Sequence, residues 1–447
     1  MSTNLAAKCP PSSRLNVRAG AAAGHTESVE QARELVPRKA AALVAEALAD
    51  TRVVTLNGAR QTGKSTLARL AAQDRPGALT RLLDDPATLR AARDDPATFA
   101  EHDDLLVIDE VQLAPELFRT IKVAVDTDQR PGQFLLTGSA QILALRDLPD
   151  ALPGRMEIIE LWRFSQGEID HSPDGFVDAA FTVGPGLART STLRKRDYLE
   201  RLVRGGYPEA VRRTPRRRAA FFESYLTSLI ERGVTELAAI ERRGDLRRLL
   251  ALLAGRSGGL LVPARLAALS GIPRTTLNRY LELLSAIFLI KQVPAWSANQ
   301  SQRAIGTAKL AFTDTGIAAH LLGQDAARLG EPDGAAGPMM ETFVLMELAR
   351  QLTWSRQRAR LYHYRTRDGV EVDAILETPD GRLVAIEVKA GATIRGEDLS
   401  GLRHLATRYG TRFAAGYVLY TGQQTLPFGD RLRGLPIDVL WTTQTPD

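Results

Sequence analysis

The sequence predicts an α/β domain with a parallel sheet, followed by a helical middle region and an α+β C-terminal domain. Three short apolar runs, Val53–Leu56, Leu105–Ile108 and Phe134–Leu136, alternate with helical stretches, a pattern typical of parallel strands. The pattern from Asp197 to Leu289 is mainly helical. After a junction rich in Gly, Ala and Pro at residues 323–337, a helix is followed by the period-two alternation of strands. Ligands of a parallel sheet bind at the carboxyl ends of its strands, so functional residues are expected there.

Length and composition limit the class of protein. The chain has 447 residues, of which 44% are hydrophobic and 25% are charged, and these values exclude wholesale disorder. No apolar run approaches the roughly 20 residues of a membrane span, and the first residues lack the order of a secretory signal. We therefore expect a cytoplasmic protein without a membrane partner. The single cysteine, Cys9, excludes disulfides within the chain and Cys-based metal centres.

Four segments are expected along the chain. Residues 1–35 are rich in Ala, Ser, Gly and Pro without a sustained period, which predicts a flexible tail. The α/β domain is expected over residues 36–175, beginning with a helix over Val36–Ala49. The helical middle region is expected over residues 176–322 and the C-terminal domain over residues 323–447.

The turn after the first apolar run carries the sharpest motif. Residues 58–65 read GARQTGKS and match GxxxxGK[ST] between a predicted strand and a predicted helix, which is the context of a phosphate-binding P-loop. The backbone amides can wrap a phosphate, Lys64 can reach the outer phosphates, and Ser65 can bind Mg²⁺. The motif predicts ATP and Mg²⁺ as cofactors. The expected binding residues are Gly58, Ala59, Arg60, Gln61, Thr62, Gly63, Lys64, Ser65 and Thr66.

The second apolar run ends in two carboxylates, Asp109 and Glu110. Beside a P-loop, Asp109 is expected to hold the Mg²⁺ shell, and Glu110 to orient or activate the attacking water, because phosphoryl transfer is catalysed mainly by positioning and electrostatics. The alternative is that the pair caps the next helix. These residue types make Glu110 and Lys64 the first candidates for catalysis of ATP hydrolysis.

Further catalytic candidates follow the third apolar run. Thr137 and Ser139 offer hydroxyls where a γ-phosphate would lie, and one of them is expected to sense that phosphate, although turn chemistry alone explains a Thr-Gly-Ser run equally well. Arg155, after a Pro-Gly pair, is a candidate arginine finger that works in trans across a subunit contact. An exposed arginine after a turn would give the same pattern.

With these motifs in place, the chain resembles a family of prokaryotic AAA+ ATPases with a winged-helix-containing middle region and a C-terminal nuclease-like domain of unknown function. The segments that carry the resemblance read GARQTGKST, LLVIDEVQ, FLLTGSA, LPGRMEIIEL, RGGYPEAV and VDAILE followed by AIEVK. The resemblance implies ATP binding, ATP hydrolysis and a homo-oligomer. One departure is Gly233, where such proteins are expected to carry Asp.

A basic middle segment indicates an anionic partner. The whole chain has a formal net charge of +6, and the stretch Ser191–Arg256 alone holds sixteen Lys and Arg against eight Asp and Glu. Nucleic acid, DNA first, is the expected partner; a solvated arginine-rich helix face is the alternative. Three helices over Asp245–Leu253, Pro263–Ser270 and Arg274–Leu284 suit a helix-turn-helix with a wing. The third helix should expose Arg274, Thr275, Asn278 and Arg279 and bury Leu277, Leu281 and Leu284.

The C-terminal domain brings acidic residues to one end of a predicted hairpin. Asp373 and Glu387 lie on strands joined by a Pro-Asp-Gly turn, and Lys389 points to the same face as Glu387. With Glu341 on the preceding helix, the pattern resembles the core of PD-(D/E)xK nucleases, which have a restriction-endonuclease-like fold. The resemblance implies that Asp373 and Glu387 bind a second Mg²⁺ or Mn²⁺, that Glu341 supports this metal and that Lys389 positions water. An ordinary hairpin with a Glu-Lys pair is the alternative.

Taken together, the sequence favours an AAA+ ATPase whose nucleotide state is coupled to nucleic-acid binding or handling. Two other functions are kept open. The first is an ATP-dependent, metal-requiring nuclease, and the second is a non-enzymatic, nucleotide-stabilised regulator that binds DNA or protein.

Overall fold

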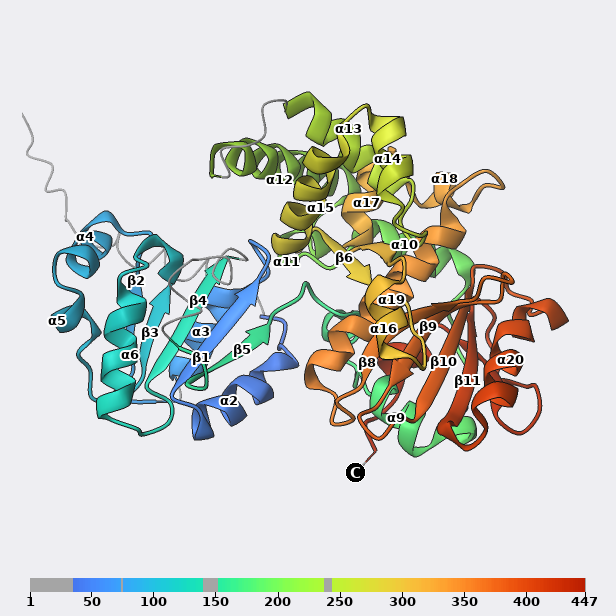
Figure 1. Cartoon of the computed structure of the whole chain (residues 1–447), viewed down its shortest axis with the longest axis horizontal. Coiled ribbons are helices and arrows are strands. Elements are labelled where there is room, and N and C mark those ends of the chain that lie inside the picture. The colour runs from blue at the N-terminus through green and yellow to red at the C-terminus, as the bar shows by residue number, and fades with distance from the viewer. Residues whose placement is uncertain (1–34, 74, 140–151, 237–242, 447) are drawn as a thin grey trace, which may run out of the picture. The chain divides into compact units, whose positions relative to one another are not determined.

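The α/β domain contains the parallel sheet that the sequence predicts. The computed structural model describes residues 35–73, 75–139, 152–236 and 243–446, so the predicted tail lies almost entirely outside the described residues (Figure 1). Five strands lie in the order β2-β3-β4-β1-β5, and every neighbouring pair is parallel. The strands are β1 (Val53–Gly58), β2 (Leu79–Leu82), β3 (Leu106–Asp109), β4 (Phe134–Ser139) and β5 (Met156–Glu160).

Helices cover both faces of this sheet because successive strand residues point to opposite sides. Val54 and Leu56 of β1 pack with the first two helices, whereas Val53 belongs to a second cluster with the later ones. Both clusters are apolar, which explains why these strands read as continuous hydrophobic runs. The helices of this domain are α2 (Ala40–Asp50), α3 (Lys64–Gln73), α4 (Pro86–Asp94), α5 (Pro96–Ala100), the 3₁₀ helix η1 (Val111–Leu113), α6 (Leu117–Thr127) and α8 (Gln166–Asp170).

The middle region is mainly helical, as predicted, with one antiparallel pair of strands, β6 (Ile290–Val293) and β7 (Lys309–Phe312). The side chains expected to face the core of α15 are buried and the four expected to face outward are exposed. Its helices are α9 (Phe176–Thr182), η3 (Gly184–Gly186), α10 (Lys195–Arg204), α11 (Pro208–Val211), α12 (Pro215–Glu236), α13 (Arg243–Ala254), α14 (Pro263–Ser270), α15 (Arg274–Ala286), α16 (Gln300–Ile305) and α17 (Thr315–Leu322), and α18 (Ala326–Gly330) follows them. Gly233, the departure from the family pattern, lies within α12.

The C-terminal domain is a mixed six-stranded sheet in the order β12-β13-β11-β10-β9-β8. The predicted hairpin is present, since β9 and β10 are antiparallel and Ala374 pairs with Ile386, which sets Asp373 opposite Glu387. The elements are α19 (Ala336–Trp354), β8 (Arg360–Arg365), β9 (Glu371–Glu377), β10 (Leu383–Lys389), η4 (Gly396–Leu399), α20 (Ser400–Tyr409), η5 (Gly410–Arg412), β11 (Phe413–Tyr420), β12 (Leu426–Pro427), β13 (Leu432–Pro436) and α21 (Val439–Thr442).

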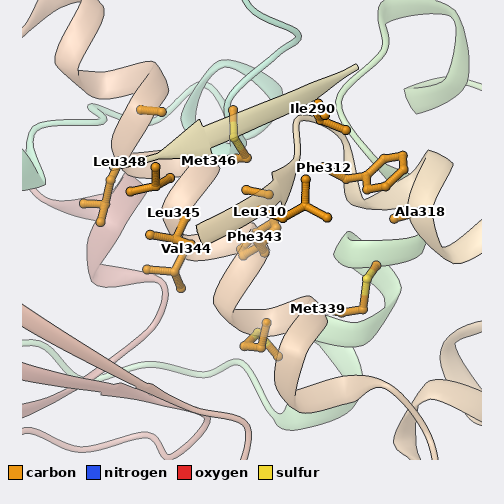
Figure 2. Packing of buried hydrophobic residues seen from close by; sticks show 14 of the residues in the cluster. Ile290, Leu310, Phe312, Ala318, Met339, Phe343, Val344, Leu345, Met346 and Leu348 are labelled. Carbon is orange, nitrogen blue, oxygen red and sulfur yellow. The ribbon is translucent and has the colours of Figure 1, made fainter. Parts of the chain in front are cut away.

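The helix α19 joins the middle and C-terminal regions. Its buried face includes Met339, Phe343 and Met346, and Figure 2 shows this face beside Leu310 and Phe312 of β7. A single cluster of buried apolar side chains includes residues from both regions. The predicted border near residue 322 therefore does not separate two hydrophobic cores. None of the helices in the described ranges combines the length and apolarity needed to cross a membrane.

Candidate functional site

The P-loop has a backbone that its glycines make possible. Gln61 and Gly63 have φ angles of 61° and 92°, in the left-handed region that glycine adopts most easily. A Cβ atom on Gly58 would lie 2.3 Å from the carbonyl oxygen of Leu161, so this position has no room for a side chain. The Thr62 hydroxyl donates to the Ala59 carbonyl at 2.9 Å. These contacts fix the loop between β1 and α3.

Lys64 is held above the loop by main-chain oxygens. Its Nζ donates to the carbonyls of Gly58 at 3.1 Å and Ala59 at 2.8 Å, and only 5% of the residue is exposed. Burial lowers the pKa of Lys64 to about 8, although Glu110 and Asp109 oppose that shift. Among the described residues no carboxylate pairs directly with this ammonium, which leaves its charge available to an anion at the loop.

The carboxyl ends of β3 and β4 bring the predicted acidic and hydroxyl residues to the same edge of the sheet. Asp109 Oδ1 accepts a hydrogen bond from Ser65 Oγ at 2.9 Å and another from the Thr137 hydroxyl. The Glu110 amide donates to Thr137 Oγ1 at 3.3 Å. Glu110 has a φ of 56°, which is uncommon for a residue with a side chain, and its carboxylate accepts from Gln112. Four predicted site residues thus meet beside the P-loop, namely Ser65, Asp109, Glu110 and Thr137.

This arrangement fits ATP with Mg²⁺. Ser65 and Asp109 already present two oxygens in mutual contact, and Mg²⁺ prefers hard oxygen ligands of these types. The amides of the loop and the ammonium of Lys64 lie at the start of α3, whose dipole favours negative charge. Of the remaining P-loop residues, Thr66 is half-buried in the first turn of α3.

Two predicted catalytic residues, Ser139 and Arg155, add no described side chain to this edge of the sheet. Ser139 ends β4 opposite Gly58, but its side chain lies outside the described part of the structure. Arg155 lies at the other end of the sheet, where its carbonyl accepts from the first residue of β1, and its guanidinium pairs with Asp126, with Nη2 3.0 Å from Oδ2. It therefore does not act on the P-loop of its own subunit.

Sequence reasoning missed Arg38, which supports the P-loop from outside the motif. Its guanidinium donates to the carbonyl of Thr62 at 2.7 Å, to the carbonyl of Trp162 at 2.6 Å and to Glu168 Oε1 at 3.0 Å. The side chains of Arg38 and Glu168 are 7% and 1% exposed. No motif marks this arginine, because its partners lie 24, 124 and 130 residues away in the sequence.

Sequence reasoning also missed Lys309, which changes the interpretation of the C-terminal acidic residues. This lysine begins β7, is 1% exposed, and lies between three carboxylates. Its Nζ is 3.1 Å from Asp373 Oδ1 and 3.4 Å from Glu371 Oε1, and it also contacts Glu341. Burial alone would lower the pKa of Lys309, but Asp373 and Glu341 hold it above its ordinary value. A positive charge of the protein itself therefore occupies the centre of this carboxylate cluster (Lys309, Glu341, Glu371 and Asp373).

The remaining contacts of these residues are also internal. Asp373 Oδ2 accepts from the amide of Val388 at 2.9 Å. Glu387 pairs with Lys389 at 3.0 Å, and Lys389 pairs with Asp398 at 3.2 Å. Within the described residues, no group of three or more His, Cys, Asp or Glu side chains is arranged to hold a metal ion. The residues predicted as a second metal site thus do not fit a divalent cation, because Lys309 pairs with Glu341 and Asp373, and Lys389 pairs with Glu387.

The basic stretch of the middle region is less uniform than its sequence. Arg216 and Arg217 are exposed, as a phosphate-binding surface requires. Arg218 is half-buried and donates to the carbonyls of Ala210 at 3.2 Å and Arg213 at 3.0 Å. Arg218 therefore caps the end of α11 rather than facing a partner.

Comparison with known proteins places these features in a family. Three family models match: an AAA domain at residues 50–170, and two domains of unknown function, DUF8612 at residues 195–328 and DUF4143 at residues 336–440. The uncharacterized proteins Rv2008c of Mycobacterium tuberculosis and Mb2031c of Mycobacterium bovis are each 30% identical over 434 residues, covering 95% of this chain and 90% of theirs. The AAA match confirms the predicted ATPase-type domain.

A solved structure is also similar to part of this chain. AMPPCP-bound DnaA from Aquifex aeolicus is 15% identical, covers 55% of this chain and 86% of its own, and has a TM-score of 0.28.

Proposed function

Because this chain belongs to the same family as the mycobacterial proteins Rv2008c and Mb2031c and carries an AAA domain, we propose that it binds ATP with Mg²⁺ and hydrolyses it. The observation that supports this proposal is the meeting of Ser65, Asp109, Glu110 and Thr137 beside the P-loop lysine, Lys64. These residues come from two strand ends, those of β3 and β4, and from the start of α3. Together they provide phosphate binding, Mg²⁺ ligation and orientation of the attacking water, which phosphoryl transfer to water needs.

The roles follow from the chemistry of each side chain. Lys64 exchanges its two carbonyl partners for the outer phosphates, and Ser65 and Asp109 hold Mg²⁺, which supplies positive charge at the phosphate oxygens. Glu110 accepts a hydrogen bond from the attacking water and orients it. Thr137 contacts both Asp109 and the Glu110 amide, so it is placed to respond to the γ-phosphate.

Substitution of Lys64 and Glu110 tests this proposal. Lys64→Ala should abolish tight binding of a fluorescent ATP analogue. Glu110→Gln should keep that binding and lower phosphate release at least about 100-fold, the effect expected for loss of a residue that activates water. Glu101→Gln is the matched control, because Glu101 is an exposed carboxylate after α5. Wild-type turnover by Glu110→Gln would show that the role given to Glu110 is wrong.

We further propose that the nucleotide state is coupled to nucleic acid, with DNA favoured, in a homo-oligomer. Support comes from the exposed arginines Arg216 and Arg217 and from α15, which presents Arg274 and Arg279 outward after a short turn, as a DNA-reading helix would. In an oligomer, Arg155 would have to leave Asp126 to serve a neighbouring site. Stimulation of ATP turnover by double-stranded, single-stranded or RNA oligomers, compared at two salt concentrations, tests the coupling.

For the C-terminal domain we propose binding rather than cleavage. The tethered ammonium of Lys309 takes the central place among the carboxylates that a nuclease would use for metal. The nuclease alternative predicts divalent-metal-dependent cleavage that Lys389→Ala abolishes, and absence of cleavage by the full chain with Mg²⁺ or Mn²⁺ supports the binding role.

A further inference from the structure

A cavity of about 450 Å³ lies beside the carboxylate cluster. It is bounded by the turn Gly255–Gly259 after α13, by the first turn of α14, by the start of α19 and by the end of β8. Three arginines, Arg256, Arg265 and Arg365, line it, so we refer to it as the arginine pocket. Pockets of about 300–1,000 Å³ hold small ligands in many proteins, and this size suits a single nucleotide unit.

The charge of the arginine pocket favours an anion. Glu341 is the only acidic residue that lines it, and Glu341 is in contact with the ammonium of Lys309. Arg365 pairs with Glu371 at 2.7 Å, whereas Arg256 and Arg265 have no ion-pair partner in the part of the chain that the structure describes. Two guanidinium groups in the lining therefore carry uncompensated positive charge.

The wall of the pocket is fixed before any ligand binds. The Gly258 amide donates to the Leu310 carbonyl, and the Leu310 amide donates to the Gly259 carbonyl, both at 2.8 Å. Gly258 has a φ of +85°, and a Cβ atom there would lie 2.8 Å from the carbonyl oxygen of Pro338. The turn is thus bonded to the strand that carries Lys309, and it closely approaches α19. A preformed pocket loses little entropy when it binds.

We propose that the arginine pocket binds the phosphate of a nucleotide unit, with a nucleic-acid strand as its source and a free nucleotide as the other source of the same chemistry. Guanidinium groups bind phosphate through paired hydrogen bonds. The first turn of α14, at the rim, has no side-chain cap, and its amides and dipole favour a negative group. The choice of a strand rests on the proposed coupling to nucleic acid. Lys309 pairs with Glu341, the acidic residue of the lining, and so reduces its repulsion of a bound phosphate.

The test measures binding of a short, labelled, 5′-phosphorylated single-stranded oligonucleotide to the full chain by fluorescence anisotropy. The P-loop is saturated with a non-hydrolysable ATP analogue and Mg²⁺, so that it cannot take part. The variant Arg256→Ala/Arg265→Ala should weaken binding at least about tenfold and reduce the salt dependence by about two counterions. Because neither arginine has a described partner, the variant should fold, and its melting temperature checks this.

The matched control is Arg356→Ala/Arg358→Ala. Both residues are exposed arginines after the last turn of α19, about 20 Å along that helix from Glu341, and the change in net charge is the same. This control should keep wild-type affinity and salt dependence. A second measurement titrates a nucleoside 5′-monophosphate by calorimetry under the same conditions.

The outcomes separate this inference from the proposed function. If wild type binds the oligonucleotide and the pocket variant binds it equally well, the pocket is not the site, while nucleic-acid binding stands. If wild type binds only the monophosphate, and the pocket variant loses it, the phosphate site stands and the nucleic-acid proposal fails. Binding of neither ligand overturns both.

Discussion

Replacing Lys309 with methionine tests whether its charge neutralises the carboxylate cluster. Methionine keeps an unbranched side chain of similar length and removes the ammonium, so packing changes little. The side chains of Glu341 and Asp373 are 17% and 12% exposed, and both lose their cation. Glu371 is 36% exposed, so water screens it and its contribution is small.

The expected loss of stability is large. Removing one partner of a buried ion pair costs about 3–5 kcal/mol, because the other charge remains buried without compensation. We therefore expect Lys309→Met to lose about that amount at pH 7. Lys291→Met is the control, since Lys291 lies on the paired strand β6, is half-exposed and lies 5.2 Å from the ring of Trp162. A single contact of that kind is worth about 0.5–1 kcal/mol.

The stability loss of Lys309→Met should change with pH in a definite direction. Burial and Asp373 raise the pKa of Glu341 well above its ordinary value, and Lys309 opposes the rise. Without Lys309 the folded chain therefore binds a proton at Glu341 more tightly than the unfolded chain does. Folding then gains stability as the pH falls toward the unfolded pKa near 4, so the deficit of Lys309→Met should shrink between pH 7 and pH 5.

Urea unfolding followed by tryptophan fluorescence measures these changes, because three of the four tryptophans, Trp296, Trp354 and Trp441, lie beyond the α/β domain. Mn²⁺ should leave the wild-type midpoint unchanged. Two results would refute the reasoning about the tethered cation. The first is a loss of stability below about 1 kcal/mol in Lys309→Met. The second is a rise of the midpoint with Mn²⁺ in the wild type that is absent in Asp373→Asn.

Two further predictions concern the nucleotide and the basic surface. Burial lowers the pKa of Lys64 to about 8, and bound phosphates raise that pKa, so ATP affinity should be fully present below pH 8 and fall as the pH rises through 8. The control Lys64→Arg should bind ATP with constant affinity from pH 7 to pH 9. An equal fall of affinity in both proteins would show that Lys64 is not the cause. Arg216→Ala/Arg217→Ala should lower the slope of log affinity for DNA against log salt by about two, whereas Arg218→Ala should affect the melting temperature more than the slope.

The predictable part of this fold is the part with short-range signals. The three apolar runs of the α/β sheet form strands because both faces of each strand are buried, and the P-loop is recognised from eight consecutive residues. The helix pattern of α15 is similarly local, since residues three and four apart share a face. In each case the information lies within one or two turns of the residue concerned.

The C-terminal site could be predicted only in part, because Lys309, which pairs with its carboxylates, is remote in the sequence. The turn at Pro379–Gly381 places Asp373 opposite Glu387, as the hairpin pattern predicts. Lys309 lies 64 residues before Asp373 and belongs to no motif. Its one local signal is a lysine at the start of a short apolar strand, a position where an unpaired charge would be costly. A charge so placed requires an acidic partner, and the sequence does not say which.

The same strand connects the carboxylate cluster with the nucleotide domain through buried polar contacts. Arg38 joins the P-loop to the carbonyl of Trp162. The next residue, Arg163, contacts the hydroxyl of Thr313, which directly follows the strand that Lys309 begins. Coupling between two sites needs an element with two arrangements that both sites bias. Lys64 is such an element at the P-loop, because its hydrogen bonds to the loop carbonyls and its bonds to a phosphate exclude each other. The Ala59 carbonyl also accepts from the Thr62 hydroxyl, and the Thr62 carbonyl accepts from Arg38. Any influence of ATP on the arginine pocket should therefore depend on the Arg38 contacts as well as on Lys64.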